Sequence, residues 1–203
     1  GRSGKRQATK AKNSGYKFKL PTVVLIDEGS ASASEIVAAA LNESAGIPLV
    51  GTKSYGKGTA QSAIDFTDGS NLKFTYAKWL TPEGNWIHKK GIKPDITVKM
   101  PEYASLSFID PKEKLALSTA STEVENAEKM LDALGYNPGK ADGYFDQDTV
   151  YAVKKFQKDH ELKETGVIQG DTTNKLMTEL RNKILEEDPQ LEAAEKKVAE
   201  EIK

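Results

Sequence analysis

The stretch that decides the fold is TVVLIDEGSASASEIVAAALNESAG, residues 22–46. Its first five residues, 22–26, form an apolar, β-branched run that predicts a strand buried on both faces. Residues 27–30 interrupt this run, and the helix formers that follow predict a helix over 33–45. A second short strand is expected to begin at Leu49. Strand, helix and strand in this order predict a βαβ unit in a layered α/β (α+β) domain.

The next part of the chain has the pattern of a β-hairpin. Residues 63–66 and 72–79 are predicted strands, and the Asp68-Gly69 pair between them is typical of a hairpin turn. Residues 91–98 are expected to complete the α/β region.

The composition changes after a linker expected between Pro101 and Pro111. Apolar residues at helical spacing predict three short helices, over residues 123–134, 149–160 and 172–185. Residues 186–203 carry seven acids and three lysines and predict either an amphipathic helix that needs a partner surface or a partly disordered tail. The predicted divisions are therefore an α/β peptidase-like region, a small all-α three-helix domain and an acidic tail, over residues 1–121, 122–185 and 186–203.

Composition excludes several kinds of function. The 203 residues have a formal net charge of -1, which gives no global attraction to nucleic acid or membrane. Cysteine is absent, which excludes disulfides and thiolate chemistry. The two histidines lie far apart without the spacing of metal ligands, so no metal or cofactor is expected. The first 19 residues hold seven Lys or Arg and no acid; we interpret them as a loop and the chain as a fragment of a longer protein.

Ser32 is the candidate nucleophile. It lies between the buried strand and the predicted helix, where a turn exposes a side chain and leaves backbone N–H groups free to bind an oxyanion. The N–H of Ala33 is the candidate oxyanion donor. The alternative is that Ser30, Ser32 and Ser34 are turn and cap residues only, with Ser34 as the N-cap of the helix.

The loop GTKSYGKGT, residues 51–59, offers two interpretations. It nearly matches a phosphate-binding loop, but Gly58 stands where a hydroxyl should bind Mg²⁺, and a strand follows where a helix should hold phosphate. We therefore favour a loop that brings Lys57 to Ser32. A lysine must lose its proton to act as a general base, which requires removal from water. The amide of Gln61 can orient the amine without adding negative charge.

These pieces resemble the carboxy-terminal processing peptidases, or tail-specific proteases. The strings that carry the resemblance are GSASASEI, YGKGTAQ and GIKPDITV, at residues 29–36, 55–61 and 91–98. The resemblance implies a partial crotonase- or ClpP-like core with Ser32 as nucleophile, Lys57 as base and Gln61 as its support. It also implies cleavage of protein or peptide substrates near their C-termini, outside the cytoplasm. Family members carry an upstream PDZ domain and further core, and a homodimer is expected by the same analogy.

The helical segment resembles the type 1 peptidoglycan-binding domain. The strings that carry this resemblance are DGYFD, residues 142–146, and AVKKFQ, residues 152–157. Peptidoglycan is therefore a candidate ligand, while a role in dimer contacts or plain three-helix packing accounts for the same residues. An alternative function follows: a wall-binding or dimerisation scaffold whose peptidase half is inactive.

Trp79 and Trp86 flank a predicted turn. Packing against the hairpin is the favoured role for them, and lining a substrate groove is the alternative. His88, beside two lysines, is expected at a solvated charged edge.

Overall fold

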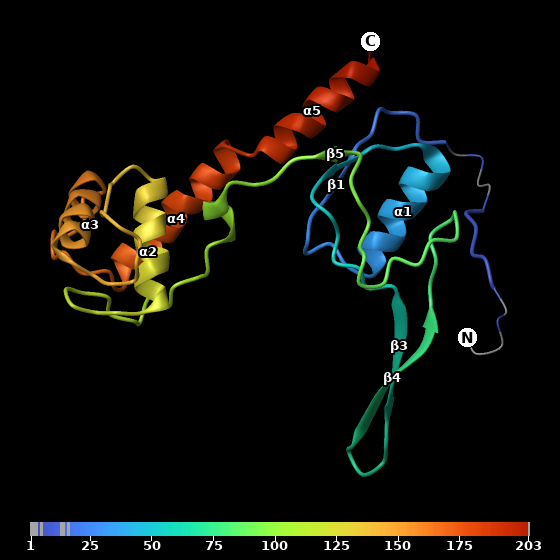
Figure 1. Ribbon diagram of the computed structural model, residues 1–203, viewed down its shortest axis with the longest axis horizontal. Helices are drawn as coiled ribbons and strands as arrows, with labels where there is room; N and C mark the ends of the chain where they lie inside the picture. Colours follow the sequence, from blue (N-terminus) through green and yellow to red (C-terminus); the bar gives the residue numbers. More distant parts are fainter. Residues whose placement is uncertain (1–3, 5, 13–14, 16, 203) are drawn as a thin grey trace. The chain divides into compact units, whose positions relative to one another are not determined.

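A computed structural model describes residues 4, 6–12, 15 and 17–202 (Figure 1). The chain divides into two compact units: Gly1–Lys99 with Pro189–Lys203, and Met100–Asp188. These limits differ from the divisions expected after residues 121 and 185, because Ile109 and Leu115 are buried in the core of the second unit. Among the described residues, no helix combines the length and apolar character required to cross a membrane.

The first unit is built on a three-stranded parallel sheet. The strands are β1 (Val24–Ile26), β2 (Leu49–Gly51) and β5 (Ile96–Thr97), in the order β1-β2-β5. Helix α1 (Ala33–Ala45) connects β1 to β2, which is the βαβ arrangement predicted from the sequence.

A small apolar core joins the sheet to α1. Ile26, Ala38 and Leu49 are buried together, and Val24 packs against them. Leu25 is 44% exposed, so the expectation that β1 is buried on both faces is wrong. Successive side chains of a strand point to opposite faces, and only the face of Val24 and Ile26 packs against α1.

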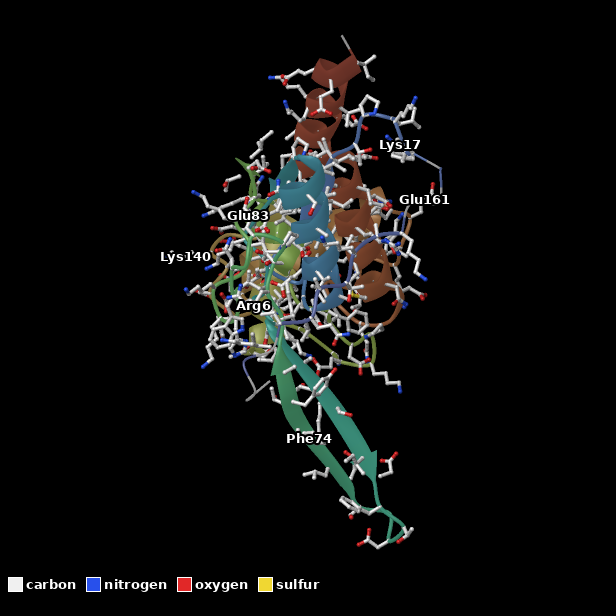
Figure 2. The ribbon with its side chains drawn as sticks, turned by 90° about the vertical axis from the view of Figure 1, so that its right-hand side faces the viewer. Arg6, Lys17, Phe74, Glu83, Lys140 and Glu161 are labelled. Carbon is white, nitrogen blue, oxygen red and sulfur yellow. The ribbon has the colours of Figure 1, made fainter. Side chains whose placement is uncertain are left out.

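Strands β3 (Thr59–Asp65) and β4 (Asn71–Lys78) form an antiparallel hairpin. Figure 1 shows the hairpin reaching away from the sheet and α1, and Figure 2 labels Phe74 on β4. The turn holds Gly69 at φ 83, as the Asp-Gly pair predicts. Strand β3 begins at Thr59, earlier than predicted, because its first residues pair with the far end of β4: Thr59 lies opposite Lys78.

The second unit is mainly helical. After the short 3-10 helix η1 (Glu102–Ser105) it contains α2 (Thr122–Ala133), α3 (Gln147–Asp159) and α4 (Asp171–Glu186). Each helix lies within two residues of its predicted range. The side chains that fill its core come from all three helices and the loops between them, including Met130, Leu131, Phe145, Phe156, Ile168 and Leu176.

The C-terminal helix α5 (Pro189–Ile202) belongs to the first unit. It contacts β1 and β2, with Ala194 buried. The Gln190 amide donates to the carbonyl oxygen of Val98 at 2.9 Å. The acidic helix therefore has its partner surface within this unit.

Candidate active site

Ser32 lies in the turn between β1 and α1 in an unusual backbone conformation. Its φ of 55° and ψ of -109° fall in a region that residues with a side chain seldom adopt. Such strain is found preferentially at functional sites. The next residue, Ala33, is exposed, and its N–H has no hydrogen-bond partner among the described residues. A free N–H at a helix start is what an oxyanion donor requires.

The N-cap of α1 is Ser32, so the expectation that Ser34 caps this helix is wrong. The reason is Glu35, the third residue of the helix, whose Oε2 accepts a hydrogen bond from the Ser32 N–H at 2.9 Å. Ser and Glu at this spacing form a capping box. Ser34 is exposed in the first turn.

The Glu35 carboxylate also accepts hydrogen bonds from the loop between β2 and β3, residues 52–58, which carries Lys57 and is named the lysine loop. Its side chain is fully buried. Besides Ser32, it receives hydrogen bonds from the Ser54 hydroxyl at 2.6 Å, the Gly56 N–H at 2.7 Å and the Lys57 N–H at 2.8 Å. Four donors satisfy a buried charge that would otherwise be costly. This carboxylate was not predicted as a site residue, although the Ser-x-x-Glu spacing was a visible signal.

Further hydrogen bonds join the nucleophile turn, the lysine loop and the segment before β5. The Tyr55 N–H donates to the Ser30 carbonyl at 3.0 Å. The buried Ser54 hydroxyl accepts from the Ile92 N–H at 2.7 Å while it donates to Glu35. The loop is therefore held on both sides.

Two glycines allow the lysine loop to pack against residues 87–91. A Cβ on Gly56, where φ is 89°, would lie 2.7 Å from the Gly91 nitrogen. A Cβ on Gly58 would lie 2.8 Å from the His88 nitrogen. These approaches leave no room for a side chain on either side of Lys57.

Both tryptophans donate to the backbone around Lys57. The indole N–H of Trp79 donates to the Lys57 carbonyl, and that of Trp86 to the Gly58 carbonyl, each at 2.9 Å. The aromatic residues expected to pack on the hairpin thus also fix the lysine loop.

Lys57 and Gln61 line one cavity of about 570 Å³. Lys57 is half-buried, and no described carboxylate forms an ion pair with its amine. Gln61 is exposed on β3, and its amide lies 3.5 Å from the Thr75 hydroxyl. Among the described residues, no hydrogen bond joins Ser32 to Lys57 through their side chains or Lys57 to Gln61. The structure brings the backbones of Ser32 and Lys57 together and places Gln61 beside the lysine.

His88 also lines this cavity, and its expected place at a solvated edge is wrong. The residue is half-buried, its ring stacks on Trp86 with centroids 5.4 Å apart, and its Nδ1 is buried without a hydrogen-bond partner in the described structure. The close approach of Gly58 to the His88 backbone explains the burial. Within the described residues, no group of three or more His, Asp or Glu side chains is arranged to hold a metal ion.

The second unit holds a buried carboxylate of its own, Glu128. Its side chain accepts from the Gly143 N–H at 2.9 Å and the Thr149 hydroxyl at 3.0 Å. Burial raises the pKa of Glu128, against the lowering effect of these two hydrogen bonds. The carboxylate ties α2 to α3 and to the DGYFD turn.

A serine on a strained strand-to-helix turn is the position of the nucleophile in some α/β enzymes, and here the N–H groups of this serine and of Lys57 share one carboxylate acceptor. Residues 1–98 match Peptidase family S41, and residues 120–176 match the Putative peptidoglycan binding domain. The chain therefore joins a region that matches peptidase family S41 to a region that matches a peptidoglycan-binding domain.

The most similar relatives include two proteins of Bacillus subtilis (strain 168). The chain is 48% identical over 193 residues to the carboxy-terminal processing protease CtpA, covering 95% of this chain and 41% of CtpA. It is 45% identical over 181 residues to the carboxy-terminal processing protease CtpB, covering 88% of this chain and 38% of CtpB. The solved photosystem II D1 C-terminal processing protease aligns with 40% of this chain and 22% of its own, at 40% identity and a TM-score of 0.37. The chain thus spans about two fifths of the length of these curated relatives.

Proposed function

We propose that this chain supplies the nucleophile and general base of a serine endopeptidase that cleaves proteins near their C-termini. The observation that carries the proposal is that Ser32 and Lys57 both donate backbone hydrogen bonds to Oε2 of Glu35. The names of the two Bacillus relatives support the position of cleavage.

In the proposed reaction, Ser32 Oγ attacks the carbonyl carbon of the scissile peptide bond while its proton passes to Lys57 Nζ. The Ala33 N–H binds the developing oxyanion. When the intermediate collapses, the C–N bond breaks, and Lys57 returns the proton to the leaving amine. A water molecule, deprotonated by Lys57, then hydrolyses the acyl-enzyme and regenerates the serine hydroxyl.

The surroundings of Lys57 leave its amine without a competing carboxylate partner among the described residues. The side chain is half-buried, and the ammonium form gains no ion pair with a described carboxylate. The Gln61 amide, on the same cavity, would orient the amine by a small rotation away from Thr75. No metal or cofactor takes part in this scheme.

The wider setting is also a proposal. We place the reaction outside the cytoplasm, with peptidoglycan as the ligand class of the second unit, on the description of the domain it matches. We propose a homodimer in which a crotonase-like core is completed by further core and a PDZ segment. Sedimentation of this chain with insoluble peptidoglycan tests the ligand. A mass that stays monomeric at every concentration in analytical ultracentrifugation would exclude the dimer of this chain.

The test of activity is hydrolysis of casein by a polypeptide of full family length that contains this chain. Ser32→Ala and Lys57→Ala should each lower the rate by about a thousandfold or more while folding is retained. Ser44→Ala and Lys53→Ala are matched controls, because both residues are exposed in the same helix and loop. Full activity in either site variant would overturn the mechanism. An inert wild type that binds peptidoglycan would favour the scaffold instead.

A further inference from the structure

The cavity beside Lys57 has a basic rim that includes His88 and Lys89, and the proposed reaction assigns no role to these two residues. Tyr55, Lys57, Thr59 and Gln61 line it from the lysine loop and β3, and His88 and Lys89 close its other side. Among the residues that the structure describes, no Asp or Glu lines it. A second hollow of about 440 Å³ adjoins Ala33 and is lined mainly by apolar side chains of β1 and α1, among them Leu25 and Val37. The cavity beside Lys57 is therefore basic, whereas the hollow beside Ala33 is mainly apolar.

Lys89 is held at the rim by its backbone. Its φ is 60°, a left-handed conformation that residues with a side chain seldom adopt, and its N–H donates to the Gly56 carbonyl at 2.8 Å. The side chain is exposed, and its ammonium forms no ion pair with a described carboxylate. Lys89 therefore presents an uncompensated charge to this cavity from a fixed backbone position.

His88 forms part of the same wall. Its ring is fixed by its stack on Trp86. Its Nδ1 is buried without a partner among the described residues, so the ring shapes this wall while Lys89 supplies the charge.

The place of Lys57 in the proposed reaction tells which part of a substrate enters the cavity. The base must lie within hydrogen-bond reach of the leaving nitrogen when it returns the proton. The residues that follow the scissile bond therefore lie on the side of Lys57, and those that precede it on the side of Ala33.

From this arrangement we propose that Lys89 and His88 form a subsite for a carboxylate on the leaving segment of the substrate, one to three residues after the scissile bond. The carboxylate is either an Asp or Glu side chain or the C-terminal carboxylate of a short tail. This assignment rests on the proposed function for its direction along the substrate, but the binding of a carboxylate at Lys89 does not depend on catalysis.

The test measures binding to this chain with Ser32→Ala, which removes turnover. Fluorescein-labelled AAEAA-amide is compared with AAQAA-amide, and AAAAA as free acid with its amide, so that the side-chain and terminal carboxylates are separated. At least one acidic peptide should bind about fivefold more tightly than its neutral partner. Added salt should reduce the difference, because Lys89 is exposed.

Two lysine variants identify the subsite. Lys89→Gln should abolish the preference and Lys89→Glu should reverse it. Lys90→Gln and Lys90→Glu are matched controls, since Lys90 is the adjacent exposed lysine and does not line the cavity. Equal binding of all peptides to the unsubstituted cavity, or an equal loss in the Lys89 and Lys90 variants, would overturn the proposal. Hydrolysis of casein by the full-length polypeptide is a separate measurement: its failure would refute the proposed activity and leave the carboxylate subsite standing.

Discussion

The backbone N–H groups of Ser32 and Lys57 donate to the same atom, Oε2 of Glu35, at 2.9 and 2.8 Å. The candidate nucleophile and base come from different loops, one before α1 and the other after β2. One buried carboxylate therefore sets their backbones relative to each other. This relationship makes Glu35 a positioning residue of the proposed reaction.

Glu35→Gln should lower proteolysis by about a hundredfold, because small misplacements of reacting groups have effects of that size. A glutamine places one NH₂ where a carboxylate oxygen now accepts, so either the Ser32 and Lys57 N–H groups or the Ser54 and Gly56 donors lose their acceptor. Steady-state kinetics should show the loss in kcat. Glu43→Gln is the control on the same helix, since Glu43 accepts one exposed hydrogen bond. An unchanged kcat in Glu35→Gln would contradict the positioning role.

Gly56→Ala should destabilise the first unit by about 2–4 kcal/mol, because the new Cβ combines a positive φ with a 2.7 Å approach to the backbone. Gly69→Ala separates these causes: φ is 83° there, but no atom lies within 4 Å of the added Cβ. Its cost should be about 1 kcal/mol. Urea unfolding of both variants measures the difference, and equal costs would mean that packing against residues 87–91 contributes nothing.

Trp79→Phe should lower kcat severalfold with KM unchanged, because it removes the donor to the Lys57 carbonyl while keeping an aromatic ring. The stability loss should be about 1 kcal/mol. Trp86→Phe removes the matching hydrogen bond one residue further on, at Gly58. Trp86→Phe should therefore lower kcat less than Trp79→Phe does. An equal loss of kcat in the two variants would mean that the indoles stabilise the whole lysine loop and do not position Lys57 in particular.

Glu128→Gln should raise the melting temperature of the second unit at pH 7 by a few degrees. Burial raises the pKa of Glu128 in the folded state, so the folded protein binds this proton more tightly than the unfolded chain does. Stability therefore falls as the pH rises from the ordinary pKa of a glutamate through the raised value, and the loss is complete above it. Glutamine retains partners for Gly143 and Thr149 but does not ionise.

The pH dependence distinguishes this effect from ordinary repacking. The melting temperatures of wild type and Glu128→Gln should converge near about pH 3, where a glutamate is protonated in both states. Glu164→Gln, at an exposed position, should change little at either pH. A gap between wild type and Glu128→Gln that is the same at both pH values would contradict the assignment to this ionisation.

Local features of the fold were predictable because they depend on near neighbours in sequence. Helix α1 has the predicted bounds, and Gly46 ends it in a left-handed conformation with φ 69, the usual role of glycine at a helix C-terminus. The Asp68-Gly69 turn lies where expected. Local propensity favours a serine cap at Ser34 as readily as at Ser32, although Ser34 lies in the first turn of α1 and Ser32 is the N-cap. The carboxylate of Glu35 separates them, by bonding both the cap and a loop 21 to 22 residues away.

The candidates for chemistry could be found from the sequence: a serine at a strand-to-helix turn, and a lysine between two glycines. The contacts that hold these two residues became visible in the folded chain. The shared oxygen of Glu35, the indole hydrogen bonds to the lysine loop and the burial of His88 all join residues that are distant in sequence. Hydrogen bonds of this kind depend on how β1, β2 and the loop before β5 pack together. Sequence periodicity indicates the face on which a residue lies, but it does not give the distance between residues that are far apart in the sequence.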